Sequence, residues 1–308
     1  MKEIIPPVDT ELLVRELEGH LLRPSNKAGN LIYDITAHEC PNTMREIARL
    51  REISYRDGGG ATGNEMDIDE MDTMAKPYHQ LIVWDPDAKQ IIGGYRYLIG
   101  TEAEIRNGQP FITSAHLFHY SERFIRDFLP HTIEFGRAFV QPMYQKREAG
   151  VKALFALDNI WDGIGAVLYN HPEVWYMIGK VTIYPDYNVT ARELIYAYLN
   201  RYHRGEEGLF EPYHPLTSNP LTSNPFVGDD KQENYHILQR AVREQGTVIP
   251  PMFSAYLNLT NDLQFFGNAI NDELANVYET GIMVEVKTVY PEKIARYITT
   301  YEQWLQNK

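Results

Sequence analysis

Two apolar runs on either side of a tight turn constrain the fold of this chain more than any other feature. They cover His79–Trp84 and Gln90–Leu98, and the turn sequence Asp85-Pro-Asp87 lies between them. Strand-like runs joined by such a short polar segment predict a β-hairpin. The remaining elements are therefore expected to assemble around this hairpin.

Further strands and helices are predicted from apolar periodicity and from helix-end signals. The predicted strands are 31–35, 132–140, 174–183 and 281–289, and the predicted helices are 9–21, 43–55, 151–168, 190–202, 230–245 and 291–305. Thr-x-x-Glu capping boxes at Thr43 and Thr190 mark two helix starts, and Gly246 marks a helix end. The order of these elements predicts an α/β fold with a mainly antiparallel front half.

Residues 205–228 are rich in Pro, Gly, Ser and Asn, and they contain a tandem duplication. Its copies are Pro215–Asn219 and Pro220–Asn224. Two copies are too few for a repeat architecture. We therefore predict an extended surface loop here rather than an active-site flap.

The charge balance and the cysteine count limit the partners and the compartment. The 42 acidic residues exceed the 29 basic ones by 13, which disfavours nucleic acid as a partner because phosphate binding needs a basic surface. The single cysteine, Cys40, cannot form an internal disulfide, as is usual in a reducing cytoplasm. The first residues lack the apolar core of a signal peptide, and no run is apolar enough to span a bilayer. We expect a cytoplasmic protein, with peripheral attachment to the inner face of the membrane as the alternative.

Several common catalytic patterns are missing from the sequence. It has no Gly-x-Ser-x-Gly elbow, no Walker loop and no dinucleotide fingerprint, since Gly58-Gly-Gly60 and Gly93-Gly94 have the wrong spacing. The pair His116-x-x-His119 lacks further ligands at zinc-site spacing. We assign no metal and no covalent nucleophile.

Charged residues inside apolar runs are the most informative signal for a site. The predicted strand 132–140 contains Glu134 and Arg137, Arg96 interrupts the second strand of the hairpin, and Arg51 lies in the helix opened at Thr43. Burying such charges is costly unless they are paired or functional. On a regular strand Glu134 and Arg137 would face opposite sides, but a bulge at Gly136 would bring both to one side. Internal salt bridges and a catalytic site both fit this pattern.

These motifs also occur in the order typical of a known enzyme family. The matching segments, which span most of Arg45–Val289, are Arg49–Tyr55, the acidic loop Glu65–Asp72, His79–Val83, Ile92–Arg96, Ile133–Arg137, Gly150–Leu154, His171–Ile183, Asp186-Tyr187, Pro250–Asn258, Phe266-Gly267 and Ile282–Val286. Together they resemble the ornithine-lipid N-acyltransferase family, often labelled hemolysin-like. Members that make glycine lipids are equally similar, and the family is related in fold to acyl-homoserine-lactone synthases.

The resemblance implies a GNAT-like α/β fold with a mixed twisted central sheet flanked by helices. It implies an N-acyltransferase that moves a long-chain, normally 3-hydroxylated acyl group to the amino group of an amino acid, of the glycine or ornithine type, in aminolipid synthesis. The expected donor is an acyl thioester of acyl carrier protein, with coenzyme A as the alternative. No cofactor is expected to be bound permanently, and the expected partners are acyl carrier protein and a small amino acid.

The resemblance also implies roles for the charged residues. Glu134 is expected to accept the amine proton, while Arg137 and Arg96 order the groups around it. The carboxylate of Glu134 lies between apolar neighbours in the sequence, which would favour its protonated form and suit a base working near neutrality. The residues expected to bind the acceptor are Arg51, Asp69 and Asp72.

The donor is expected at Gln145-Lys-Arg-Glu-Ala-Gly150, which resembles the pyrophosphate loop Gln/Arg-x-x-Gly-x-Gly/Ala of GNAT enzymes. The predicted donor-binding residues are Gln145, Lys146, Arg147, Gly150 and Val151. Glu148 stands where a glycine is expected, and a glutamate there opposes phosphate at a helix amino terminus. Lys146, Arg147 and Lys152 form the basic patch predicted for acidic acyl carrier protein.

Two further functions remain alternatives: an acyl-homoserine-lactone-like signal synthase, and a non-catalytic lipid-binding or hemolysin-like protein. The predicted organisation is an amino-terminal arm and helix in residues 1–40, followed by a GNAT-like domain in residues 41–308. That domain carries the long loop 205–228 and a carboxy-terminal extension.

Overall fold

The computed structural model describes residues 1–217, 219, 221 and 223–308, apart from the side chain of Arg147. The chain forms two compact units. The first contains Met1–Ala103, Ile133–Val174 and Pro291–Lys308, and the second contains Glu104–Thr132 and Trp175–Tyr290. The boundary predicted after residue 40 stays a prediction. Part of the duplicated loop, residues 218, 220 and 222, lies outside the described residues.

The first unit is built on an antiparallel sheet in the order β1-β2-β3-β4-β8. Its strands are β1 (Leu21–Pro24), β2 (Leu31–Ile35), β3 (His79–Asp85), β4 (Gln90–Ile99) and β8 (Thr132–Val140). Its helices are α1 (Thr10–Leu17), α2 (Pro41–Asp57), α3 (Glu70–Thr73), α4 (Gly150–Asn170), α8 (Pro291–Ile294) and α9 (Thr300–Gln306), with one π-helical turn, Ala295–Thr299, joining the last two. The predicted hairpin and the strands 31–35 and 132–140 are confirmed.

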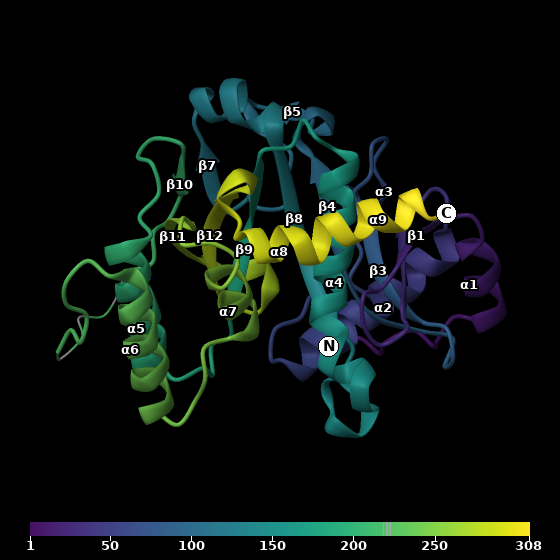
Figure 1. Ribbon diagram of the computed structural model, residues 1–308, viewed down its shortest axis with the longest axis horizontal. Coiled ribbons are helices and arrows are strands. Elements are labelled where there is room, and N and C mark those ends of the chain that lie inside the picture. The colour runs from purple at the N-terminus through teal and green to yellow at the C-terminus, as the bar shows by residue number, and fades with distance from the viewer. Residues whose placement is uncertain (218, 220, 222) are drawn as a thin grey trace. The chain divides into compact units, whose positions relative to one another are not determined.

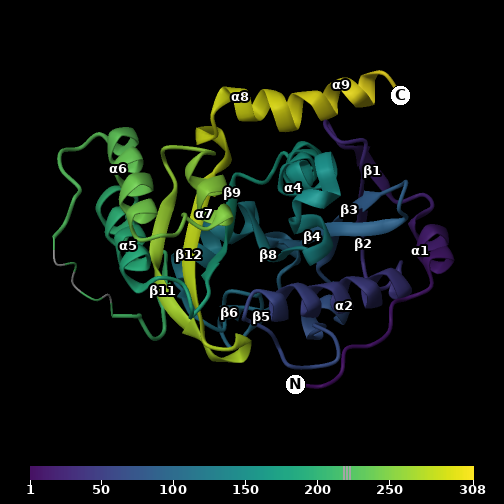
Figure 2. The same cartoon turned by 90° about the horizontal axis from the view of Figure 1, so that it is seen from below.

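Helices cover both faces of this sheet, with α2 on one face and α4 on the other (Figure 2). Neighbouring residues of β3 show the alternation: Ile82 belongs to the core formed with α2, whereas Leu81 packs against Gly163 of α4. A strand covered on both faces is expected to be apolar throughout. That arrangement explains why β3 is a continuous apolar run rather than an alternating one.

The start of α2 differs from the prediction. Pro41 occupies the first turn and Thr43 lies inside the helix. Glu16 of α1 supplies the cap, since its carboxylate accepts hydrogen bonds from the backbone amides of Asn42 at 3.0 Å and Thr43 at 2.7 Å. The predicted capping box at Thr43 is wrong because a carboxylate from another helix satisfies these amides.

Two other predicted boundaries are also wrong. The first helix ends at Leu17 rather than residue 21, because Gly19 takes a left-handed conformation and Leu21 begins β1. At the predicted capping box Thr190, the cap is instead Asn188, whose side chain accepts from the amide of Ala191 at 3.0 Å. Asparagine is among the preferred residues at this position.

The second unit contains an antiparallel sheet in the order β9-β12-β11 (Figure 1). Its strands are β9 (Tyr176–Ile183), β12 (Val277–Glu285) and β11 (Gln264–Asn271), with the short strands β5 (Ile105–Arg106), β6 (Gln109–Pro110), β7 (Phe118–Tyr120) and β10 (Phe210–Pro212). Its helices are α5 (Val189–Tyr202), α6 (Lys231–Glu244) and α7 (Pro251–Leu257). The predicted helix 230–245 is confirmed, with Asp230 as its cap, whereas the predicted strand 281–289 lies four residues earlier as β12.

Candidate functional site

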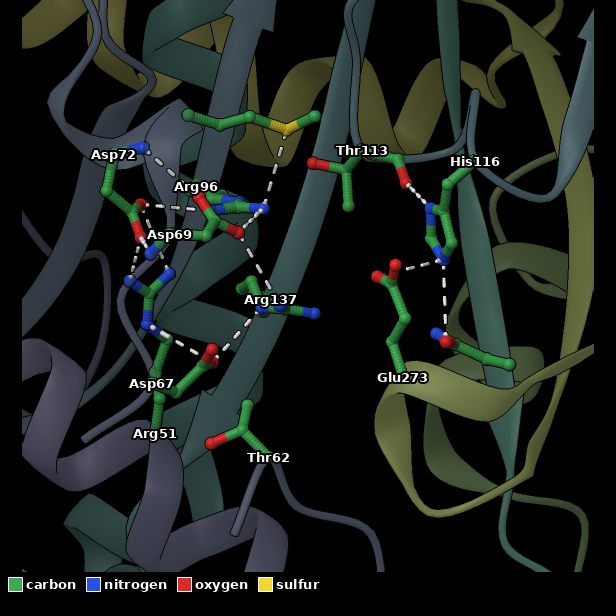
Figure 3. A network of polar contacts seen from close by, with 12 residues as sticks. Arg51, Thr62, Asp67, Asp69, Asp72, Arg96, Thr113, His116, Arg137 and Glu273 are labelled. Atoms are coloured by element: carbon green, nitrogen blue, oxygen red, sulfur yellow. Dashed lines mark hydrogen bonds and ion pairs between the residues drawn. The ribbon is translucent and has the colours of Figure 1, made fainter. Parts of the chain in front are cut away.

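A compact network of charged side chains lies at the centre of the first unit, and Figure 3 shows it from close by. Its members are Arg51, Asp67, Asp69, Asp72, Arg96 and Arg137. We call it the arginine–aspartate network. Five of these six residues were singled out from the sequence, and the structure brings all five together. Three positive and three negative charges make the network neutral as a whole.

Asp72 and Arg51 form the buried floor of the network. Both side chains are 1% exposed, and Arg51 Nη2 lies 2.9 Å from Asp72 Oδ2. The other oxygen of Asp72 lies 3.0 Å from Arg96 Nη1 and accepts a hydrogen bond from Gln80 at 3.0 Å. Both oxygens of this carboxylate are therefore occupied by donors.

Arg96 of β4 connects the floor to the more exposed side. Its guanidinium binds the carboxylate of Asp69 with two hydrogen bonds of 2.8 Å, the bidentate geometry that arginine favours. Asp69 caps α3, and its side chain and that of Asp72 each accept from the other residue's backbone amide at 3.2 Å. The capping box of α3 thus fixes both aspartates in one orientation.

Arg137 enters the network from a bulge in β8. Gly136 pairs with Arg96 but Phe139 pairs with Gly94, so β8 has one residue more than β4 in this stretch. Arg137 has a φ of 53°, a left-handed conformation that is uncommon outside glycine. The predicted bulge is therefore present, but Arg137 rather than Gly136 takes the unusual conformation.

The bulge turns the Arg137 guanidinium towards two carboxylates. Its Nε lies 3.1 Å from Asp67 Oδ2, and its Nη2 lies 3.5 Å from Asp69 Oδ2. Asp69 and Arg137, with side chains 33% and 17% exposed, are the only members of the network that reach the surface to this extent. Among the network residues, these two have the best access to a small polar ligand.

Mutual pairing fixes the charges of the network. Burial opposes ionisation of Asp69, but the charge and hydrogen bonds of Arg96 outweigh it and hold the pKa of that carboxyl well below its usual range. Burial likewise disfavours the charged form of Arg96, yet Asp72 and Asp69 raise its pKa above the ordinary value. Asp69 and Arg96 therefore stay charged near neutral pH.

Glu134 lies beside the network. Its side chain is buried and accepts a hydrogen bond from the hydroxyl of Tyr78. The Tyr78 ring lies under Arg96, whose Cζ is 5.0 Å from the ring centroid. Glu134 is thus connected to the network through Tyr78, on the same face of the sheet as Arg96.

The predicted donor segment surrounds the start of α4. Gly150 opens the helix with a φ of 63°, and the side chain of Gln145 donates to the carbonyl of Val140 at 2.6 Å. Val151 is exposed, as is Lys146. The side chain of Arg147 lies outside the described part of the chain. The role of this segment in donor binding stays a prediction.

Lys152, by contrast, already forms ion pairs with neighbouring carboxylates. Its ammonium group binds the carboxylates of Asp85 and Asp87, the latter at 2.8 Å. These contacts offset its positive charge, so Lys152 adds little to a basic patch. Asp85 ends β3 and Asp87 lies in the hairpin turn that follows, and their pairing with Lys152 was not apparent from the sequence.

The second unit contains a separate polar cluster. His116 Nδ1 lies 2.7 Å from the carbonyl of Thr113, and Nε2 lies 3.4 Å from Oδ1 of Asn271. Burial and the charge of Lys180 lower the pKa of His116. His116 lies in a turn and His119 in β7. In the described part of the chain, no group of three or more His, Cys, Asp or Glu side chains could hold a metal ion.

Comparison with known proteins decides the family. A family model described as an acetyltransferase (GNAT) domain matches residues 50–154. A glycine N(alpha)-acyltransferase of Bacteroides thetaiotaomicron is 48% identical over 306 residues, which cover 98% of this chain and 91% of that protein. One of Phocaeicola vulgatus is 45% identical over 98% of this chain and 94% of that protein.

The chain belongs to this family of GNAT-type N-acyltransferases. The predicted GNAT-like fold and the predicted acyltransferase activity are confirmed. A solved N-acyl amino acid synthase from uncultured soil microbes is similar at a TM-score of 0.39 and 10% identity, covering 89% of this chain and 97% of that one. No helix in the described residues is both long enough and apolar enough to cross a membrane.

Some residues of this candidate site were missed in the sequence. Asp67 lies in the acidic loop noted in the sequence, but only the fold shows that it pairs with Arg137. Tyr78 and Gln80 flank the start of β3 and carried no signal, since tyrosine and glutamine are common at strand ends. The useful clue was the acidic loop itself, because two buried arginines and one partly exposed arginine need carboxylates nearby.

Proposed function

We propose that this protein transfers a long-chain, normally 3-hydroxylated acyl group from an acyl thioester to the amino group of glycine. The observation that carries the proposal is the identity of 48% and 45%, over nearly the whole chain, to two proteins named glycine N(alpha)-acyltransferase. Acyl carrier protein is the proposed donor carrier, and synthesis of an aminolipid is the proposed role. Residence in the cytoplasm, with peripheral attachment to the membrane as the alternative, belongs to the same proposal.

The proposed reaction is direct transfer. The lone pair of the glycine amine attacks the thioester carbonyl, a C–N bond forms, the C–S bond breaks, and the thiol of the carrier leaves. The amine loses a proton, which Glu134 accepts directly or through water, and the thiolate takes up a proton on leaving. No covalent enzyme intermediate is needed, consistent with a sequence that lacks a nucleophile motif.

The contacts of the network support a division of roles among the residues predicted to bind the acceptor and those predicted to order the groups around it. Glycine carries an ammonium group and a carboxylate, and the partly exposed pair Asp69 and Arg137 offers one charge of each sign. Arg51 and Asp72 are buried; Asp72 pairs with Arg51 and Arg96, and Arg51 pairs with Asp72 and Asp67. We propose that Asp69 and Arg137 contact the acceptor, while Arg51, Asp72 and Arg96 hold them in place.

The donor end of the proposal rests on the start of α4. Gln145, Lys146, Arg147, Gly150 and Val151 are proposed to bind the pantetheine arm and its carrier. Since Asp85 and Asp87 already pair with Lys152, the basic patch reduces to Lys146 and Arg147. Glu148 opposes a phosphate at this helix start, which favours a carrier protein over free coenzyme A.

The deciding experiment offers purified protein the same acyl chain as a thioester of acyl carrier protein and of coenzyme A. Each donor is incubated with glycine, with ornithine and without acceptor, and thiol release and product mass are measured. We expect thiol release that depends on glycine, and an N-acylglycine product. Thiol release without any N-acyl amino acid would refute the proposal.

Glu134→Gln tests the proposed base. The variant keeps the shape of the side chain and an oxygen that can accept from Tyr78. A general base contributes on the order of 10²–10⁴ in rate, so we expect a kcat loss of that size with the melting temperature unchanged. A folded variant that keeps most of its turnover would show that Glu134 is not the base. Loss of stability together with activity would favour a structural role.

A further inference from the structure

Glu52 is a buried carboxylate that lies next to the arginine–aspartate network but is not part of it. It follows Arg51 in α2, and its side chain is fully buried. Burying a carboxylate is costly unless donors surround it. Glu52 has four: Nε of Arg56 at 2.8 Å, the amide of Thr62 at 3.2 Å, the hydroxyl of Thr62 at 2.7 Å, and the amide of Gly63 at 3.0 Å.

Three of these donors belong to one loop. Residues 58–69 connect α2 to α3, and no strand of the described chain includes them. Arg56, itself held by Glu52, donates to the carbonyl of Asn64 at 2.5 Å. Glu52 and Arg56 thus bind the middle of the loop from a single turn of α2. Ordering a loop costs conformational entropy, so such anchors decide whether the loop holds one conformation.

The same loop delivers two carboxylates to the network. Asp67 lies 3.1 Å from Arg137 Nε, and Asp69 is bound by Arg96. The hydrogen bond from the Asp67 amide to the carbonyl of Ala48, 3.0 Å long, ties the far end of the loop to α2 as well. Two consecutive residues of α2 therefore serve the network. Arg51 is one of its members, and Glu52 holds the loop that carries Asp67 and Asp69.

We propose that Glu52 is a positioning residue for the acceptor site, acting through the loop 58–69 on Asp67 and Asp69. The proposal rests on the proposed function, because the acceptor is the ligand that Asp69 and Arg137 are proposed to bind. A displacement of about 1 Å in a binding group can cost 10²-fold in rate. Release of the loop therefore weakens acceptor binding without touching the donor segment.

The test compares Glu52→Gln with Glu16→Gln. Glu16 is a matched control because it also binds a threonine hydroxyl, at 2.9 Å, and two backbone amides, at 3.0 and 2.7 Å. Those groups lie at the opposite end of α2. We expect Glu52→Gln to raise KM for glycine at least tenfold, with KM for the acyl donor unchanged. Glu16→Gln changes neither KM by more than about twofold.

A second variant keeps the proposal testable if the Glu52→Gln protein does not fold. Thr62→Val removes one donor to Glu52 and leaves the carboxylate in place, and Thr62→Ser restores the hydroxyl. We expect Thr62→Val to raise KM for glycine and Thr62→Ser to return it to the wild-type value. Folded Glu52→Gln and Thr62→Val proteins with wild-type KM for glycine, or an equal rise in Glu16→Gln, would overturn the proposal.

Amide hydrogen exchange separates this proposal from the proposed function. If the wild-type protein does not acylate glycine, the proposed function fails while the loop can still be measured. We expect the amides of residues 60–69 to exchange at least tenfold faster in Glu52→Gln than in the wild type, and Glu16→Gln to leave them unchanged. Unaltered exchange in a folded Glu52→Gln protein would refute the anchoring role by itself.

Discussion

Asp72→Asn should destabilise the protein strongly, because it removes one charge from the buried floor of the network. The Asp72 carboxylate forms ion pairs with Arg51 at 2.9 Å and Arg96 at 3.0 Å, and it accepts a hydrogen bond from Gln80 at 3.0 Å. The Asp72 side chain is 1% exposed. Hydrogen bonds to charged groups contribute about 1.5–3 kcal/mol each, and two of these donors are charged. Breaking a buried ion pair from one side costs about 3–5 kcal/mol. We expect a loss of that size in the free energy of unfolding.

The assay is equilibrium unfolding in urea, with the free energy obtained by linear extrapolation. The midpoint should fall while the slope stays constant, because the same surface is exposed on unfolding. Glu11→Gln is the control: its ion pair with Lys89, 3.1 Å long, has side chains 69% and 50% exposed. Exposed pairs contribute about 0–1 kcal/mol. A cost of no more than about 1 kcal/mol beyond this control would show that the buried contacts of Asp72 contribute little to stability.

Three further outcomes follow from buried groups elsewhere. Burial lowers the pKa of His203 to about 4, below its value of about 6.5 in the unfolded chain. The contribution of the neutral histidine to the free energy of unfolding is therefore fully present above about pH 6.5, and about 3 kcal/mol is lost as the pH falls towards 4. Urea unfolding at several pH values should show this dependence in the wild type, and His203→Asn should lack it. Burial, with the charges of nearby glutamates, raises the pKa of Cys40 to about 12. Iodoacetamide should therefore label the Cys40 thiol only after unfolding, and rapid labelling of the native protein would contradict this prediction. Gly165→Ala places a methyl group against the carbonyl of Tyr297 and should lower the free energy of unfolding by about 1–3 kcal/mol. Thermal unfolding measures this loss, and an unchanged melting temperature would show that the segment around Tyr297 moves to accommodate the methyl group.

The sequence alone determined the elements whose signals are local. The β3–β4 hairpin was predictable because two strand-like runs flank a turn sequence, and strand β8 because its run is apolar and bounded. The charged members of the site stood out for a related reason. A buried charge is costly, so Arg96 or Arg137 within an apolar run indicates a partner or a function before any partner is known.

Partners were decided only by the tertiary structure. Asp67 meets Arg137 across 70 positions of the chain, and Tyr78 meets Glu134 across 56, so no local pattern could pair them. The cap on α2 came from Glu16, a residue of another helix, and local rules therefore assigned it wrongly to Thr43.

The bulge in β8 shows most clearly what local sequence patterns cannot predict. A left-handed conformation costs glycine least, and so the sequence pointed to Gly136. The unusual conformation falls on Arg137 because pairing with β4 and the two carboxylates of the acidic loop hold it there. Local preferences thus fix where strands and helices form. The placement of a charged side chain depends on what distant segments bring to it, and that information exists only in the folded chain.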